Sequence, residues 1–154
     1  MNLYTDASTR HHSGIAFILT DDRDTELLRK AMVVQERDNN TAELLAILLG
    51  LEEIKGKVGK VKVYTDSTYA LGIIFGKPCR RWEKGIVSNI RECMKEVSCE
   101  FVWIKGHSHK NGMHSYYNRE ADNLANHIRK QHVIQKRLSK LQRAQRSKIS
   151  RERE

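Results

Sequence analysis

The spacing of the apolar residues changes along the chain, and this change restricts the folds that the chain can adopt. Apolar residues cluster or alternate in Asn2–Asp6, Gly14–Thr20 and Thr25–Val34, a pattern typical of strands. The polar run Asp21–Asp24 predicts a turn that makes the second and third strands a hairpin. Between Thr41 and Lys57 the apolar residues recur every three or four positions, which predicts a helix with Thr41 as its N-cap.

Strand and helix patterns alternate through the rest of the body. Trp82 is in phase with Ile86 and Ile90, so we expect it to be a core anchor. Three antiparallel strands followed by two strands reached through helices indicate an α/β fold, with a mixed five-stranded sheet and helices on both faces. The remaining predicted elements are strands at Val61–Asp66 and Cys99–Lys105, helices at Ser67–Phe75 and Trp82–Val97, a polar loop at 106–117, and a last helix opened by Asn118.

Carboxylates end two of the predicted strands. Right-handed crossovers would make the first and fourth strands parallel, and ligands bind beyond the carboxyl ends of such strands. The same Y-T-D-x-[ST] pattern closes both, as Tyr4–Ser8 and Tyr64–Thr68. If these strands are neighbours, Asp6 and Asp66 lie side by side and repel each other unless they share a proton or bind a cation. No Lys or Arg lies within three residues of either acid, which favours a metal.

Two further acids stand among apolar helical residues. Glu43 lies in the first predicted turn beside Leu44, and Asp122 lies beside Ala121 in the last helix. Taken singly, each acid is explained more simply as a residue that caps a helix or ends a strand. Together with Asp6 and Asp66 they offer four hard oxygen ligands, which describe a magnesium or manganese site. A two-metal centre of this kind suits in-line attack by water on a phosphodiester.

Five blocks of sequence, in order, resemble the type 1 ribonuclease H family over residues 1–128. The resemblance implies the ribonuclease H fold and hydrolysis of the RNA strand of RNA:DNA hybrids, leaving 5′-phosphate and 3′-hydroxyl ends. It also implies two Mg²⁺ ions, with Mn²⁺ as a substitute, held by the four acids Asp6, Glu43, Asp66 and Asp122. The blocks are Y-T-D-A-S, N-N-T-A-E-L-L-A, Y-T-D-S, W-I-K-G-H and N-R-E-A-D-N-L-A.

A histidine-bearing loop precedes the last block. His107 follows Lys105 and Gly106 as the family's loop histidine does, which implies a catalytic role in proton transfer or product release. The loop is longer than in common bacterial members, so His109 is the alternative to His107. His109 and His114 also fit a solvated loop imidazole.

The resemblance extends to contacts with the substrate. Asn39 and Asn40 precede Glu43 as the family's asparagine pair does, and amides can both donate to and accept from a ribose 2′-hydroxyl. An Asn-Asn pair is equally ordinary in a turn. Ser8 and Thr68 are weaker candidates, each two residues beyond an acid. The basic protrusion of bacterial relatives is much shorter here; its remaining candidate phosphate contacts are Arg80, Arg81 and Lys84.

The positive charge of the chain is concentrated at its end. Of the net charge of +9, residues 1–128 contribute +1, whereas residues 129–154 carry ten basic and two acidic residues, a net +8. We therefore expect a catalytic domain at 1–128 and a basic tail or helical extension at 129–154, which would grip nucleic-acid backbone or merely stay solvated.

The remaining composition narrows the class of protein. The chain has one domain's length, and three cysteines without C-x-x-C spacing indicate reduced, mostly buried thiols. No apolar run is long enough for a membrane span and no signal peptide is evident, so we expect a cytoplasmic monomer with no membrane partner and a place in nucleic-acid metabolism such as DNA replication. Alternatives are a DNA-acting nuclease of the same fold and a non-catalytic hybrid-binding replication accessory module.

Overall fold

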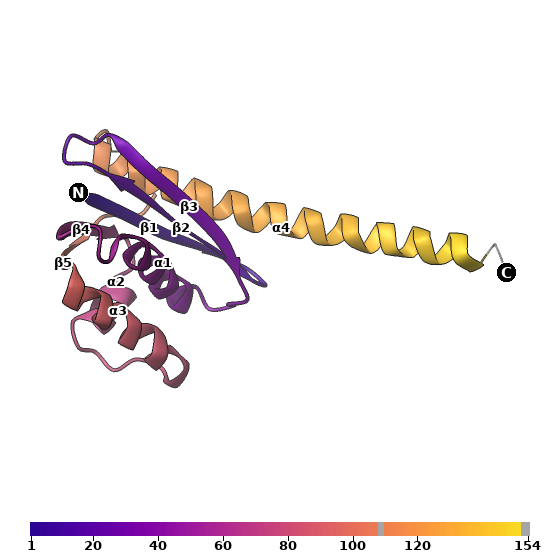
Figure 1. Ribbon diagram of the computed structural model, residues 1–154, viewed down its shortest axis with the longest axis horizontal. Coiled ribbons are helices and arrows are strands. Elements are labelled where there is room, and N and C mark those ends of the chain that lie inside the picture. Colours follow the sequence, from indigo (N-terminus) through magenta and orange to yellow (C-terminus); the bar gives the residue numbers. More distant parts are fainter. Residues whose placement is uncertain (108–109, 152–154) are drawn as a thin grey trace.

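The computed structural model describes residues 1–107 and 110–151. Five strands form one mixed sheet in the order β3-β2-β1-β4-β5, with helices on both faces (Figure 1). The β1–β2 and β2–β3 pairs are antiparallel and the β1–β4 and β4–β5 pairs are parallel, as the sequence predicts. The strands are β1 (Asn2–Thr9), β2 (Ser13–Thr20), β3 (Glu26–Val34), β4 (Lys60–Thr65) and β5 (Ser98–Trp103), and the helices are α1 (Asn39–Ile54), α2 (Thr68–Ile74), η1 (Arg81–Glu83, 3₁₀), α3 (Lys84–Glu96) and α4 (Met113–Arg151).

The two faces of the sheet pack against different helices. Strand residues alternate in direction, so Leu3 and Val63 join the core beneath α1, α2 and α3, whereas Tyr4 and Tyr64 face α4. The first core includes Phe17, Leu44, Ile47, Leu51, Ile73, Ile90 and Val97, and the second includes Ile18, Tyr117 and Ala121.

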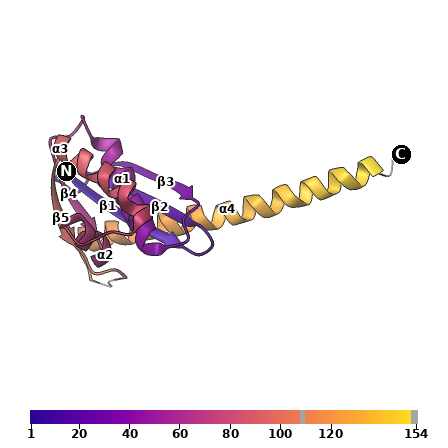
Figure 2. The same ribbon diagram turned by 90° about the horizontal axis from the view of Figure 1, so that it is seen from below.

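Helix α4 crosses its face of the sheet from one edge to the other. Near its start, the Tyr117 hydroxyl donates to the Asp24 carbonyl in the β2–β3 turn at 2.7 Å. A Cβ on Gly14 would lie only 2.1 Å from the Ala125 carbonyl oxygen, so glycine permits this close packing of α4 on β2. Farther along, the Arg129 guanidinium donates to Ser8 Oγ at 2.9 Å, where β1 ends. Beyond this edge α4 continues outward as a single helix (Figures 1 and 2).

The start of α1 differs from the prediction. The N-cap is Asp38 rather than Thr41, because the Asp38 side chain accepts from the backbone N–H groups of Asn40 and Thr41. The Thr41 hydroxyl instead donates to Glu83 at 2.7 Å. The helix ends at Ile54, before the predicted Lys57.

The prediction that Trp82 anchors the core is wrong. Trp82 lies in η1 and is 62% exposed, with its indole N–H donating to Thr41 Oγ1 at 3.2 Å. Its neighbour Glu83 is fully buried in its place. A 3₁₀ turn has three residues per turn, so it shifts the phase that the spacing to Ile86 and Ile90 implied.

The last helix begins before its predicted start and continues through residues that were expected to form a basic tail or a helical extension. It begins at Met113 rather than Asn118 and runs without a break to Arg151, across the predicted boundary between 1–128 and 129–154. Most of the residues of this helix are polar or charged. No helix in the described ranges is both long and apolar enough to cross a membrane. All three cysteines are free, as predicted, but only Cys93 is fully buried.

Candidate active site

Parallel pairing of β1 and β4 sets the first two acids beside each other. The register aligns Asn2 with Lys62 and Tyr4 with Tyr64, an offset of 60 residues, and the same offset separates Asp6 from Asp66. Asp6 lies in the second half of β1 and Asp66 directly follows β4. The repeated Y-T-D pattern therefore corresponds to the register of the sheet.

Glu43 joins these two acids from α1. Because α1 begins earlier than predicted, Glu43 lies in its second turn and is only 4% exposed. One carboxylate oxygen each of Asp6, Glu43 and Asp66 lies within 4.8 Å of the other two. The Oε2 atom of Glu43 is buried and has no hydrogen-bond partner among the described residues. Three clustered carboxylates, one of which has a buried and unpartnered oxygen, fit a divalent metal ion.

The pKa values of the three carboxylates are all raised, in each case chiefly by burial. The pKa of Asp6 lies well above its ordinary value, because the group is buried and faces the charges of Glu43 and Asp66. Burial, followed by the charge of Asp66, raises the pKa of Glu43 to about 8. Burial also raises the pKa of Asp66. Within residues 1–107 and 110–151 none of the three forms an ion pair with Lys or Arg, so a proton or a metal must relieve the repulsion.

Asp122 and His107 flank the cluster. Asp122 lies on α4, and its charge raises the pKa values of Asp6, Glu43 and Asp66, which places it near all three. It is not one of the three acids within 4.8 Å. His107 Nδ1 lies 3.8 Å from Asp122 Oδ2, and the His107 side chain is 84% exposed. The imidazole therefore stands at the solvent side of the cluster.

The other loop histidines differ in position. His114 Nδ1 lies 2.7 Å from the Tyr4 hydroxyl, and its ring stacks on Tyr64 with centroids 4.5 Å apart. His114 is thus a packing residue on the face covered by α4. His109 lies outside the described residues.

A cavity of about 300 Å³ opens beside the acids. Its walls include Asn39 and Asn40 from the start of α1 and Thr68 from the start of α2, which brings these three predicted substrate contacts next to Glu43 and Asp66. Ser8 is placed differently. Its hydroxyl donates to Asn126 Oδ1 at 2.9 Å and accepts from Arg129, so it ties β1 to α4.

The predicted phosphate contacts lie around η1. The Arg80 guanidinium is paired with the Asp38 carboxylate and lies over the rings of Tyr69 and Trp82, with its central carbon 5.3 and 5.4 Å from the two centroids. This pairing holds Arg80 beside the first turn of α1. Arg81 and Lys84 are exposed.

Two residues near the site were not predicted from the sequence. Glu83 accepts hydrogen bonds from the Tyr69 hydroxyl at 2.5 Å, the Thr41 hydroxyl at 2.7 Å and the Arg80 backbone N–H at 3.0 Å. Gly106 packs against Asp66, since a Cβ there would lie 2.3 Å from Asp66 Oδ2. The only sequence signal for Gly106 is its place before His107; none distinguishes Glu83 from an exposed helix-end acid.

Comparisons with known proteins agree with this fold and identify the family. Among solved structures, LC11-RNase H1, a compost-derived protein determined with an RNA/DNA hybrid, matches with a TM-score of 0.73 and 24% identity, covering 86% of this chain and 98% of that chain. RNase H1 of Halobacterium salinarum matches with a TM-score of 0.72 and 16% identity, covering 84% and 97%. The N-terminal RNase H domain of a Mycobacterium tuberculosis protein matches with a TM-score of 0.70 and 19% identity, covering 82% and 91%. The RNase H family model matches residues 1–130, so the chain belongs to the RNase H family.

Proposed function

We propose that this protein hydrolyses the RNA strand of RNA:DNA hybrids and leaves 5′-phosphate and 3′-hydroxyl ends. The observation that carries the proposal is the cluster of Asp6, Glu43 and Asp66, whose carboxylate oxygens lie within 4.8 Å of one another without a basic partner among the described residues. Membership of the RNase H family and the fold shared with a relative solved with an RNA/DNA hybrid support it.

The acids would hold the metal that the chemistry needs. Asp6, Glu43 and Asp66 are the ligands of choice, with Asp122 completing the negative site from α4. Magnesium, or manganese in its place, supplies Lewis-acid activation of water and neutralises charge on the leaving oxygen when it is bound. In this reaction water attacks phosphorus, the bond from phosphorus to the ribose 3′ oxygen breaks, and that oxygen takes up a proton. His107, exposed and beside Asp122, is positioned to exchange protons with solvent during turnover.

The walls of the adjacent cavity suit a ribose. Asn39 and Asn40 present amides that both donate and accept hydrogen bonds beside Glu43. A 2′-hydroxyl is both donor and acceptor, so these amides would favour RNA over DNA in the cleaved strand.

Cleavage of defined duplexes tests the proposal. The full chain is incubated in magnesium with end-labelled RNA:DNA hybrid, duplex DNA and duplex RNA. We expect cleavage of the RNA strand of the hybrid alone. Asp66→Asn should reduce the rate at least about a thousandfold, because it removes one ligand charge from the cluster.

Asp24→Asn is the matched control. Asp24 lies in the β2–β3 turn at the opposite edge of the sheet, and asparagine tolerates its left-handed φ of 61°. It should cut at the wild-type rate. Cleavage of duplex DNA would assign the site to a DNA nuclease, and hybrid binding without any cleavage would assign the chain to a non-catalytic role; either result overturns the proposal.

A further inference from the structure

The part of α4 beyond the sheet is a continuous helical basic arm, which we define as residues 130–151. Residues 134–151 are all exposed, and the arm contains eight Lys or Arg residues and no Asp or Glu. At about 1.5 Å per residue the arm is about 33 Å long. That is close to one turn of a nucleic-acid duplex, about 34 Å.

The arm is anchored at the edge of the sheet that carries the acids. Arg129, only 7% exposed, donates to Ser8, two residues beyond Asp6, and to Asn126, four residues beyond Asp122. The His12 imidazole donates to the Arg129 carbonyl at 3.2 Å. These contacts fix where α4 leaves the body, and Figure 2 shows the arm continuing outward from that edge.

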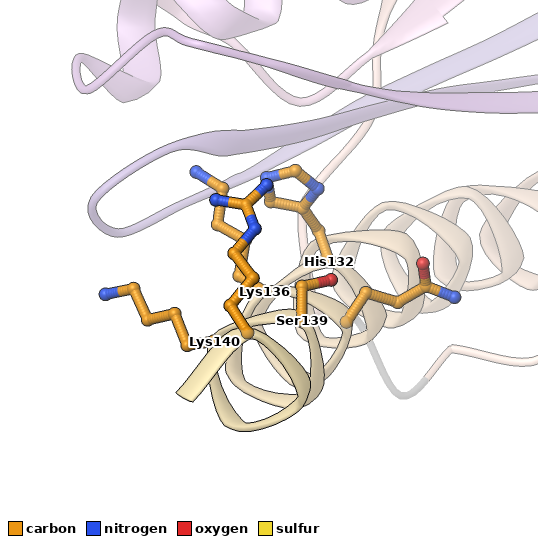
Figure 3. Close-up of a pocket in the computed structure, with 6 residues that line it drawn as sticks. His132, Lys136, Ser139 and Lys140 are labelled. Atoms are coloured by element: carbon orange, nitrogen blue, oxygen red, sulfur yellow. The ribbon is translucent and has the colours of Figure 1, made fainter. Parts of the chain in front are cut away.

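The charges of the arm lie on one side of the helix. At about 100° per residue, Lys140 has nearly the same direction from the axis as Asp122, and all the arm's cations except Arg146 lie within about 80° of it. The exposed apolar residues Ile134, Leu138 and Leu141 lie about 100° to 160° away. Figure 3 shows Lys136 and Lys140 projecting outward from α4 beside His132 and Ser139. The basic side of the arm therefore continues the side of α4 that faces the acids.

A basic cleft joins the arm to the body. Arg10 and His11, in the turn after β1, and Lys130 and Arg137, on α4, line a cleft of about 500 Å³. The positive surface thus begins about 12 Å along the helix axis from Asp122 and extends for the whole arm.

We propose that the basic arm binds the phosphate backbone of the duplex whose strand is cut, on the side of the active site beyond the β1–β2 turn. This inference rests on the proposed function and names a second contact with the same substrate. A duplex carries about one negative charge per 1.7 Å, so a straight basic helix of this length faces many phosphates.

Charge decides against a second copy of the chain as the occupant. Ile134, Leu138 and Leu141 have coiled-coil spacing, but the next positions of that seam are Gln145 and Lys148. A stable coiled coil needs three or four such heptads, and two arms of eight positive charges repel each other.

Salt-dependent binding tests the arm. Binding of the full chain to a fluorescent hybrid is measured by anisotropy in EDTA, so that no cleavage occurs, over a series of salt concentrations. The variant Lys136→Gln/Lys140→Gln/Arg143→Gln should bind at least about tenfold more weakly at 0.1 M salt. The slope of log affinity against log salt should become shallower by about 2.7, because about 0.9 is lost for each phosphate contact. Glutamine keeps helix propensity close to that of lysine, so circular dichroism should be unchanged.

The matched control also removes three positive charges, but from the end of the sheet opposite the arm. Lys57→Gln/Lys60→Gln/Lys62→Gln changes exposed residues in the turn before β4 and at the start of β4, and this variant should bind within about twofold of wild type. A finer pair is Lys140→Gln against Arg146→Gln, of which only the first should weaken binding.

Cleavage and oligomeric state separate the outcomes. If the wild type cuts the hybrid and the arm variant binds with wild-type affinity and salt slope, the arm proposal fails while the proposed function stands. If no form cuts the hybrid but the arm variant still binds more weakly, the function fails while backbone binding by the arm stands. A dimer that Leu138→Gln dissociates, with binding unaffected by the arm variant, would assign the arm to self-association and overturn the proposal.

Discussion

Gly106 leaves no space for a side chain beside Asp66. The position where a Cβ would stand is 2.3 Å from Asp66 Oδ2 and 3.0 Å from its Cγ, and Asp66 is held as part of the acid cluster. A methyl group here must displace either the carboxylate or the backbone after β5. The glycine before His107 therefore governs the position of an acid far away in sequence.

Replacement of Gly106 by alanine should impair catalysis more than folding. We expect Gly106→Ala to lower the cleavage rate of the hybrid at least about tenfold, because a displacement of the order of 1 Å at a catalytic group costs about that much or more. The melting temperature should change little, since the residue lies in the loop after β5 and is only partly buried. Gly59→Ala, where nothing lies within 4 Å of the added Cβ, is the control and should match wild type. Equal activity of the two variants would refute this account.

The three hydrogen bonds to Glu83 join parts of the fold whose contact no sequence pattern predicts. Tyr69 belongs to α2, Thr41 to α1 and Arg80 to the segment before η1, and all three donate to one buried carboxylate. The Glu83 carboxylate thereby holds the start of α1, where Asn39 and Asn40 lie. It affects the active site by positioning these residues and not by touching the acids.

Glu83→Gln should therefore destabilise the protein. The amide keeps the shape but weakens three charge-assisted hydrogen bonds and introduces N–H donors facing other donors, so we expect a loss of about 1.5–3 kcal/mol in the free energy of unfolding. Urea denaturation measures this. At saturating hybrid the cleavage rate should fall less than for Gly106→Ala. Glu92→Gln, exposed and paired with Lys95, is the control and should lie within about 0.5 kcal/mol of wild type.

Some features of the helices and strands can be predicted from the local sequence pattern, and others depend on contacts with residues far away in the chain. The register of β1 with β4 was predictable because Tyr4–Ser8 and Tyr64–Thr68 repeat the same pattern. The N-cap of α1 was not, because Thr41 is as good a cap in sequence as Asp38 and was used instead for a bond to Glu83. Trp82 was mispredicted for a different reason, because its phase with Ile86 and Ile90 holds only in a regular α-helix and Trp82 lies in the 3₁₀ helix η1.

At the scale of the whole molecule, the acid cluster opposes folding when no metal is bound. The pKa of Glu43 is about 8 in the folded chain against an ordinary 4.5, so the folded state holds a proton that the unfolded state releases. Stability from this group is therefore full below pH 4.5 and declines as the pH rises from 4.5 to 8. The pH window is set by Glu43, with Asp6 shifted in the same direction.

Thermal denaturation at two pH values tests this linkage. In EDTA the melting temperature should be at least about 4 °C lower at pH 8.5 than at pH 6, because about 1 kcal/mol corresponds to about 2–4 °C in a protein of this size. Magnesium should reduce the difference, since it binds the folded carboxylates and not the unfolded chain. Glu43→Gln removes the titrating group and should reduce the difference in EDTA as well. A melting temperature that rises from pH 6 to 8.5 would contradict the prediction.

The fold as a whole was more predictable than the course of its last helix. The five strands followed from the hydrophobic period and their directions from right-handed crossovers, and Asp6 and Asp66 followed from where two strands end. The continuation of α4 to Arg151 did not, because Ile134, Leu138 and Leu141 keep helical spacing over too few turns to distinguish a helix from a solvated tail. The spacing of the basic residues is visible in the sequence. It places them on the same side of the helix as Asp122 only if the helix is continuous from Asp122.

The shared register of β1 and β4 has a consequence for how such a chain can vary over evolution. The β1–β2 and β2–β3 turns can gain or lose residues without changing the pairing of Asp6 with Asp66, because the register of β1 with β4 sets that pairing. Within a strand, one inserted residue between Tyr64 and Asp66 would turn the carboxylate to the opposite face, and two would carry it about 6.6 Å along the sheet. Relatives that keep this site should therefore carry insertions and deletions in the turns, with the interval from tyrosine to aspartate unchanged.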